Sequence, residues 1–165
     1  MSNKIWEFTG ETKVRFGITL RRIRATVEFK LKRGIVISKG ELGGWIEKES
    51  NLSGNAWVSG NALVSGSAKV SGDAWVHGNA KVSGNAWVSG NAKVKSSEDY
   101  CVYKNTWSSF RWFTYTRSNK MWSVGCFHGT GAELIAKAYK DSEKSGKCYE
   151  AIVKAQEAIE KEMEV

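Results

Sequence analysis

The chain has 165 residues, of which 41% are hydrophobic and 25% charged, a composition typical of a folded globular protein and not of a disordered one. No stretch approaches the roughly 18 to 20 consecutive apolar residues that span a bilayer, and the first six residues lack the apolar run of a signal peptide, so we expect a cytoplasmic protein without a membrane partner. The three cysteines have no C-x-x-C spacing and are accompanied by only two histidines, so we predict reduced thiols and no metal site.

The formal net charge of +8 is unevenly distributed along the chain. Residues 1–45 contain ten Lys and Arg against four Asp and Glu, whereas residues 130–165 are slightly acidic. A basic surface attracts phosphate groups of any kind, although such a charge can also serve solubility alone. Because the sequence contains no recognised nucleic-acid-binding motif, we favour a small anionic ligand over long nucleic acid.

Residues 1–45 predict an N-terminal β cap. Polar and apolar residues alternate from Lys4 to Phe29, which predicts two or three strands that cover the start of the next segment. The clearest are Lys13–Leu20 and Arg22–Phe29. Arg22 and Arg24 share one face of the second strand, where they form a candidate cationic cluster for an anion.

Residues 46–95 repeat with a period of six. An aliphatic residue recurs without a slip, a small residue lies two positions before it and a glycine two positions after it. A coil that turns a corner every six residues explains this pattern, because the aliphatic side chain fills the interior, only a small residue fits beside it, and glycine tolerates positive φ at the corner. The aliphatic positions are Ile46, Leu52, Val58, Val64, Val70, Val76, Val82, Val88 and Val94, and the small positions begin at Ser50 and Ala56.

This pattern resembles the hexapeptide-repeat family, whose members form short left-handed parallel β-helices with about 18 residues per coil. The segments Leu20–Ala25, Gly40–Ser53 and Val124–Thr130 further resemble bacteriophage and prophage proteins of this group, in which a small C-terminal α/β tail follows the repeats. The resemblance implies a mainly β protein that associates as a homotrimer or a dimer of trimers in the cytoplasm of the host cell.

With about 18 residues per coil, the outward residues that precede the aliphatic ones form columns. Trp57 then stacks on Trp75, and Lys69 on Trp87. Exposed tryptophan columns are unfavourable in water, so we expect Trp57, Trp75 and Trp87 to lie in the oligomer interface.

Residues 96–165 predict an α+β module with a β-hairpin and two helices. Strands are expected at 100–103, 110–116 and 121–127, with a turn at 117–120. Thr130–Glu133 is a capping box that opens a helix ending near Glu143, and Gly146 is expected to interrupt the chain before a second helix over Lys147–Glu162.

The segment Tyr103–Trp122 is the richest candidate for a ligand site because its aromatic residues are interleaved with Lys and Arg. Aromatic faces stack on bases and Arg binds phosphate in bidentate fashion, although the same aromatics could simply pack in a core. Alternation places Arg111, Phe113 and Tyr115 on one face of a strand and Trp112 on the other. The candidates for binding an anionic, nucleotide-like ligand are Ser108, Ser109, Arg111, Trp112, Tyr115, Arg117, Lys120 and His128, together with Arg22 and Arg24.

The family resemblance leaves three functions open. The first, which we favour, is a non-enzymatic protein without a cofactor or catalytic residue, which sequesters a nucleotide-type immune signal, as small phage-encoded oligomers do. The second is an acyltransferase that uses acetyl-CoA, with His77 as general base. His77 occupies a corner position held elsewhere by serine and has neither an acid partner nor an acceptor-binding insertion loop, so an ordinary corner residue is the better interpretation. The third is a trimeric assembly or protein-interaction module.

Overall fold

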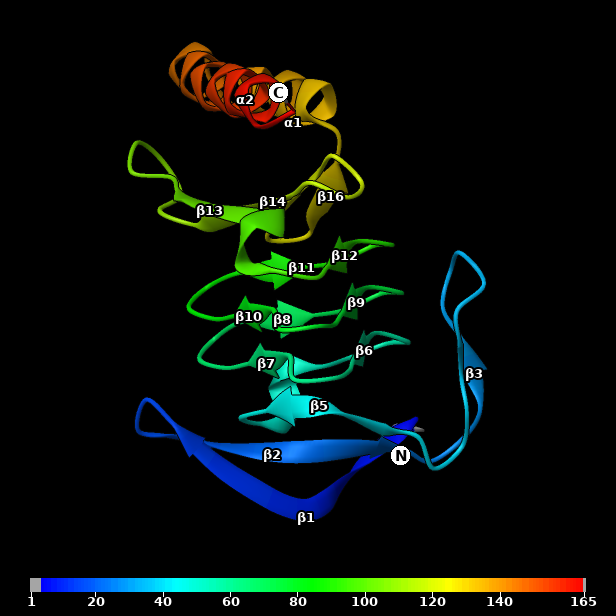
Figure 1. The fold of residues 1–165 in the computed structure, drawn as a ribbon. Helices are drawn as coiled ribbons and strands as arrows, with labels where there is room; N and C mark the ends of the chain where they lie inside the picture. Colours follow the sequence, from blue (N-terminus) through cyan, green and yellow to red (C-terminus); the bar gives the residue numbers. More distant parts are fainter. Residues whose placement is uncertain (1–3, 165) are drawn as a thin grey trace.

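A computed structural model describes residues 4–164 as a mainly β protein with two C-terminal helices (Figure 1). Three layers follow one another along the chain: an N-terminal hairpin, a stack of coils formed by residues 46–95, and a sheet covered by the helices. We call residues 46–95 the coiled segment and residues 96–164 the C-terminal module. None of the helices in residues 4–164 is long and apolar enough to cross a membrane.

The N-terminal hairpin covers the first coil, as predicted. Strand β1 (Trp6–Arg15) pairs antiparallel with β2 (Ile18–Ala25), and β2 pairs antiparallel with β5 (Leu42–Ile46). Strand β5 in turn pairs in parallel with β7 (Leu63–Val64) of the coiled segment. One sheet therefore continues from the cap into the stack.

The turn of this hairpin lies inside Lys13–Leu20, so the prediction of one strand there is wrong. Phe16 and Gly17 have φ of 51° and 74°, the positive values that a two-residue hairpin turn requires. Polar and apolar residues alternate on both sides of the turn, and alternation alone gives no sign of a turn this short.

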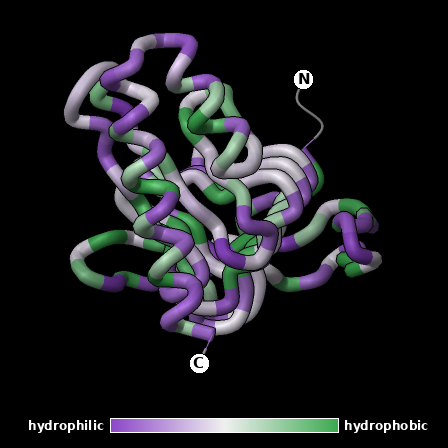
Figure 2. The backbone as a smooth tube through the Cα atoms, turned by 90° about the horizontal axis from the view of Figure 1, so that it is seen from above, coloured by the Kyte–Doolittle hydropathy of each residue, from purple (hydrophilic) through white to green (hydrophobic). Residues whose placement is uncertain are grey.

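A second hairpin lies beside the coiled segment. Strands β3 (Phe29–Lys30) and β4 (Val36–Ile37) pair antiparallel and project to one side of the stack (Figures 1 and 2). The Phe29 ring meets the Trp57 ring edge-on, with centroids 5.6 Å apart. The hairpin thus covers part of one wall of the coiled segment.

The coiled segment is built from two-residue strands that pair in parallel from one coil to the next. Its backbone hydrogen bonds follow one repeated pattern: Trp57 N donates to Ala74 O at 2.9 Å and Leu63 N to Ala80 O at 2.9 Å. Three walls result, with the strand orders β5–β7–β10, β8–β11 and β6–β9–β12. The remaining strands are β6 (Trp57–Val58), β8 (Lys69–Val70), β9 (Trp75–Val76), β10 (Lys81–Val82), β11 (Trp87–Val88) and β12 (Lys93–Val94).

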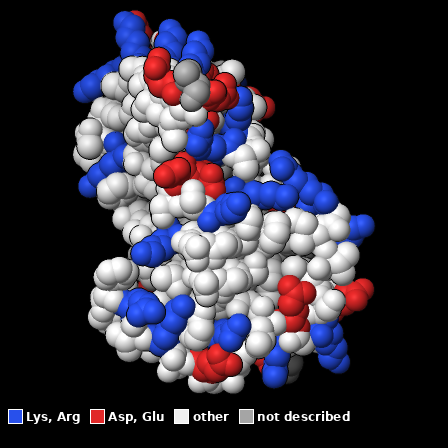
Figure 3. Space-filling view, viewed as in Figure 1, with Lys and Arg blue, Asp and Glu red and all other residues white. Residues whose placement is uncertain are grey.

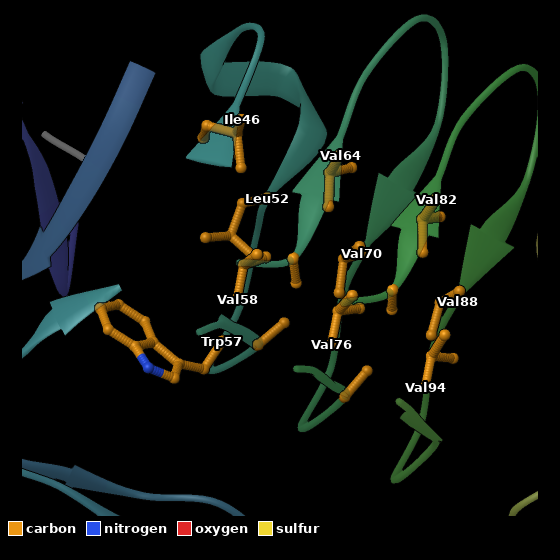
Figure 4. Close-up of a cluster of buried hydrophobic side chains, with 14 of the residues drawn as sticks. Ile46, Leu52, Trp57, Val58, Val64, Val70, Val76, Val82, Val88 and Val94 are labelled. Carbon is orange, nitrogen blue, oxygen red and sulfur yellow. The ribbon is translucent and has the colours of Figure 1, made fainter. Parts of the chain in front are cut away.

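The predicted interior of the coiled segment is confirmed. Every aliphatic residue of the repeat is buried, and the alanines that accompany them are at most 1% exposed (Figure 4). The corner glycines have the expected positive φ; at Gly72, with φ of 69°, an added Cβ would lie only 3.0 Å from Gly90 N of the next coil. Burial of each valine side chain contributes about 1.5–3 kcal/mol to folding.

The first repeat departs from the pattern. Ser50 is exposed in a short 3-10 helix, η1 (Glu49–Asn51), and the buried residue there is Asn51. Asn51 Nδ2 donates to Ala68 O at 2.8 Å and to Gly66 O at 3.2 Å. Ser50 therefore does not fill the interior position predicted for it, because the chain enters the stack through a helical turn.

The C-terminal module has a four-stranded antiparallel sheet under two helices. The strands lie in the order β13–β14–β15–β16, and a second 3-10 helix, η2 (Ser97–Asp99), precedes them. The predicted turn at 117–120 and the Thr130–Glu133 capping box are both present. The bounds are β13 (Tyr100–Lys104), β14 (Trp112–Thr116), β15 (Met121–Val124), β16 (Phe127–Gly129), α1 (Gly131–Asp141) and α2 (Glu143–Met163).

Gly146 does not interrupt the second helix, so that prediction is wrong. Helix α2 begins at Glu143, and the Ser142 side chain accepts a hydrogen bond from Ser145 N as its N-cap. A Cβ at Gly146 would lie 2.3 Å from the Tyr139 ring of α1. The glycine therefore allows the two helices to approach closely.

The C-terminal module closes the open end of the coiled segment. The last coil has no following coil to accept its N–H groups, and side chains of the module accept them instead. Trp87 N donates to Thr114 Oγ1 at 2.8 Å, and Lys93 N donates to Ser118 Oγ at 2.7 Å. The module keeps a core of its own, separate from that of the coiled segment.

Candidate functional site

Four of the five cations predicted to bind an anion are ion-paired within the chain. A carboxylate partner offsets their charge, most of all for Arg117, whose pair with Glu160 is the least exposed, and least for Lys120, whose pair with Glu164 is open to solvent. Among residues 4–164 the Arg111 guanidinium makes neither an ion pair nor a hydrogen bond. The pairs are Arg22 with Glu11 at 3.1 Å, Arg24 with Glu7, Arg117 with Glu160 at 3.0 Å and Lys120 with Glu164 at 4.0 Å.

A pocket of about 130 Å³ lies between the loop that follows β13 and helices α1 and α2. Three predicted ligand residues, Ser108, Ser109 and Arg111, line it together. Lys137 of α1 and Tyr149 of α2 complete its polar lining from the helical side. We call it the loop pocket.

Asn105 organises the hydroxyl groups of the loop pocket. Its side chain is buried, and Oδ1 accepts hydrogen bonds from the backbone N–H groups of Trp107 at 3.1 Å and Ser108 at 2.9 Å. This fixes the amide orientation, so Nδ2 donates to Ser108 Oγ at 2.9 Å, Ser109 Oγ at 3.3 Å and Tyr149 OH at 3.1 Å. The amide has two N–H donors, so the two shorter contacts, to Ser108 Oγ and Tyr149 OH, are the ones it satisfies. Because these two oxygens accept from Asn105, their own protons are free to donate into the pocket.

The charges around the loop pocket favour an anion. Arg111 and Lys137 supply two cations, and Asp141 supplies one carboxylate. The Arg111 guanidinium lies against Gly125, where an added Cβ would be 3.0 Å from its Nη1 and where φ is 55°. Glycine at this position therefore leaves room for the guanidinium. The polar groups of the pocket are mainly hydrogen-bond donors, which suit the oxygens of a phosphate or carboxylate, while apolar side chains such as Leu134 and Phe127 form the rest of its lining.

Tyr115 is not available to a ligand, so its predicted role is wrong. It is 5% exposed and packs on Trp122 with ring centroids 5.0 Å apart, in the core beneath the helices. Burial, with a further contribution from Glu160, raises the pKa of Tyr115 to about 12. The predicted alternation of β14 itself is correct, because Phe113 and Tyr115 face the helices while Thr114 faces the coiled segment.

Trp112 lies on the same face of β14 as Thr114, beside the wall of the coiled segment. Its side chain is 42% exposed and lines a shallow groove together with Trp87. It is therefore accessible to a ligand, but from outside the loop pocket.

His128 joins the C-terminal module to the last coil and does not point toward the start of α1. Its Nδ1 lies 3.0 Å from both Ser89 Oγ and Ser123 Oγ, and the two hydroxyl oxygens are 2.7 Å apart. Burial lowers the pKa of His128, which favours a neutral ring whose Nδ1 accepts a hydrogen bond from a serine. The prediction that His128 donates to a bound anion is not supported by this geometry.

The three tryptophans predicted at an oligomer interface differ in exposure. Trp57 is fully buried within the chain, where it points away from the aliphatic ladder toward the β3–β4 hairpin, so the expectation that it is exposed is wrong (Figure 4). Trp75 and Trp87 are half-buried, and their indole N–H groups donate to Ser59 Oγ at 2.9 Å and Ser71 Oγ at 2.8 Å. Trp57 thus has no free surface for a second subunit, whereas Trp75 and Trp87 do.

His77 lies on the wall that carries Trp75. The two rings are stacked with centroids 3.9 Å apart. Burial lowers the pKa of His77, and the positive charges of Lys93 and Lys95 lower it further. The ring is outside both the loop pocket and the groove beside Trp112.

Three residues of the loop pocket were missed at the level of sequence: Asn105, Lys137 and Tyr149. The spacing of Asn105 and Ser108 fits a turn in which the Asn side chain binds the backbone, so this residue could have been found. Lys137 and Tyr149 come from helices distant in sequence, and only the packing of those helices brings them to the loop.

No three His, Cys, Asp or Glu side chains cluster in a way that could hold a metal ion within residues 4–164. No protein-family model matches the sequence, and no curated protein matches it.

Proposed function

We propose that this chain is a non-enzymatic binding protein that holds an anionic ligand of the nucleotide type through the loop pocket. The observation that carries the proposal is the convergence of Arg111, which has no ion-pair partner among residues 4–164, with the hydroxyl groups of Ser108, Ser109 and Tyr149 around the buried Asn105 amide. Such a set of donors binds phosphate oxygens without the need for a catalytic group. The residues that line the pocket include no histidine.

The proposal extends from the loop pocket to the fold, the oligomeric state and the biological role of the protein. We propose that the coiled segment is a left-handed β-helix of the hexapeptide-repeat type, in a phage-encoded homotrimer or dimer of trimers that sequesters a nucleotide immune signal in the host cytoplasm. The six-residue period and the parallel pairing of Trp57 with Trp75 support the fold assignment. Sequestration requires binding without turnover, and native mass spectrometry can test it by weighing the released ligand and counting the subunits.

Isothermal titration calorimetry with ADP and with inorganic diphosphate tests the pocket directly. We expect the wild-type protein to bind both, and Arg111→Gln to weaken both at least about tenfold, because hydrogen bonds to a charged group contribute about 1.5–3 kcal/mol. Arg15→Gln is the control, since it removes an exposed arginine at the end of β1 that lines neither the loop pocket nor the groove beside Trp112. Equal affinity of Arg111→Gln and wild type would exclude the loop pocket as the site.

The acyltransferase hypothesis has one observation in its favour, the lowered pKa of His77. A histidine that is neutral at neutral pH can act as a general base toward an acceptor. Transfer of the acetyl group from acetyl-CoA, lost in His77→Ala, would support this function over binding alone.

The assembly hypothesis is favoured by the half-exposed Trp75 and Trp87 on two walls of the coiled segment. A protein partner retained by wild type and lost in a Trp75→Ala, Trp87→Ala double variant, with no nucleotide bound, would favour that function.

A further inference from the structure

A groove of about 290 Å³ lies next to the loop pocket, where β14 crosses the wall of the coiled segment. Two tryptophans from different layers line it: Trp87 from the last coil and Trp112 from the C-terminal module. Lys69, Arg111 and Gly125 also line it. Figure 3 shows Lys and Arg side chains on the visible face at the level where these two layers meet.

Arg111 belongs to both cavities. It lines the loop pocket together with Ser108 and Ser109, and it lines the groove together with Trp112. Its guanidinium lies against Gly125, which is followed in the chain by Cys126 of the loop pocket. A guanidinium presents donors along several edges of one plane, so a single arginine can contact groups on both sides.

Trp87 is held in place before any ligand binds, whereas the ring of Trp112 has a lysine alone over its face among residues 4–164. The Trp87 indole N–H donates to Ser71 Oγ at 2.8 Å, and Lys69 Nζ lies 5.6 Å from the ring centroid. Lys104 Nζ lies 5.4 Å from the Trp112 ring centroid. Thr114 Oγ1, two residues after Trp112, accepts from Trp87 N and so attaches β14 to the coil. A ring fixed by a hydrogen bond, as Trp87 is, loses little conformational entropy when a flat ligand stacks on it.

The size of the loop pocket indicates that it holds only part of a ligand. Its volume of about 130 Å³ is below the roughly 300–1,000 Å³ of ordinary small-molecule sites. The groove adds about 290 Å³ and contains two tryptophan rings, whereas the loop pocket contains Arg111, Lys137 and a set of hydroxyl groups. The loop pocket therefore suits a charged group, and the groove suits a planar apolar group.

We propose that the loop pocket and the groove form one bipartite site for a nucleotide. The phosphate lies in the loop pocket, the base lies against Trp112 and Trp87 in the groove, and Arg111 stands between them. This inference rests on the proposed function, and it adds that the protein distinguishes a nucleotide from a free phosphate through the base. Stacking on one tryptophan strengthens binding by about tenfold or more.

Calorimetry with ADP and inorganic diphosphate on wild type, Trp112→Ala and Trp112→Phe tests the inference. We expect wild type to bind ADP at least about tenfold more tightly than diphosphate, and Trp112→Ala to lose this difference while its affinity for diphosphate stays unchanged. Trp112→Phe keeps an aromatic face and should recover part of the difference. Phe110→Ala is the matched control, because Phe110 is 65% exposed in the loop just before β14 but lines neither cavity.

The outcomes separate the two proposals. Binding of diphosphate and ADP with equal affinity, unchanged in Trp112→Ala, would overturn the bipartite site and leave the anion-binding function standing. Absence of binding of both probes to wild type would overturn the proposed function and this inference with it. A loss of diphosphate binding in Trp112→Ala would also overturn the inference, because it would place the anion in the groove.

Discussion

The coiled segment and the C-terminal module solve the same problem, burial of apolar surface, in opposite ways. From Ala56 onward the coiled segment buries one aliphatic residue and one alanine in each repeat, and its backbone hydrogen bonds repeat from coil to coil. The module buries an assortment of large side chains, including Phe113, Trp122 and Tyr149, whose rings meet at different angles. A repetitive surface offers nearly the same chemistry on every coil, whereas the irregular module can form a site that occurs once. This difference explains why the loop pocket lies in the module.

The junction combines features of both regions. The last coil supplies backbone N–H groups in the regular pattern, and the module supplies Thr114 and Ser118 to accept them. The groove beside Trp112 exists only because an irregular strand crosses a regular wall there.

The largest effect is expected from a charge in the regular interior. Val76 is fully buried in the middle of its wall, with coils on both sides, so Val76→Asp should destabilise the fold by more than about 4 kcal/mol and prevent cooperative folding. Thermal unfolding followed by circular dichroism measures this. The control is Val36→Asp, at a valine that is 51% exposed in β4, which should leave the melting temperature nearly unchanged. A native-like transition in Val76→Asp would show that the stack tolerates the loss of one interior position.

A smaller effect is expected at the junction. Thr114→Val keeps the shape of the side chain but leaves Trp87 N without its acceptor, which should cost about 1–3 kcal/mol. Urea unfolding gives this value, and hydrogen exchange at the Trp87 amide should speed up at the same time. Thr106→Val, at an exposed threonine in the nearby loop, is the control. Unchanged exchange at Trp87 would mean that water replaces the hydroxyl without loss.

The smallest effect concerns pH at the same junction. The pKa of His128 is lowered in the folded protein by burial, so the unfolded chain takes up a proton more readily than the folded one. Its contribution to stability is therefore complete above the unfolded pKa of about 6.5 and declines as the pH falls through that value toward the lowered folded pKa. Melting temperatures between about pH 5 and pH 8 should fall more steeply on the acid side for wild type than for His128→Gln, which does not titrate. Because the pKa of His77 is also lowered, the variant should keep part of the slope. Parallel curves for the two proteins would contradict this account of His128.

Much of the fold was predictable because its signals are local or periodic. The six-residue period gave the interior ladder from Val58 to Val94, and the Thr130–Glu133 box gave the start of α1. The predictions of secondary structure were wrong where a local pattern fits two different structures. Gly146 was interpreted as a helix breaker but allows close helix packing, and the turn at Phe16 and Gly17 lay inside an alternating run.

The candidate site was predictable only as a set of residue types. Ser108, Ser109 and Arg111 were identified from a mixture of hydroxyl, aromatic and cationic residues, and they do line one pocket. The same pattern also selected Tyr115 and Arg117, which the structure places in the core and in an ion pair with Glu160. Composition alone does not distinguish a cation that faces solvent from one that faces a carboxylate.

The sequence by itself determined the period, the interior and the presence of a basic aromatic segment, since each is a property of neighbouring residues. Tertiary structure decided which of those residues remain free. Arg117 meets Glu160 across 43 positions of the chain, and Trp57 loses its exposure to a hairpin that precedes it. Such contacts depend on how separate elements pack against one another. The six-residue repeat uses the same few residue types in every coil, so its sequence does not indicate which other segment covers each wall. Arg111 makes no ion pair among residues 4–164, although α1 presents both Lys137 and Asp141 to the pocket that it lines.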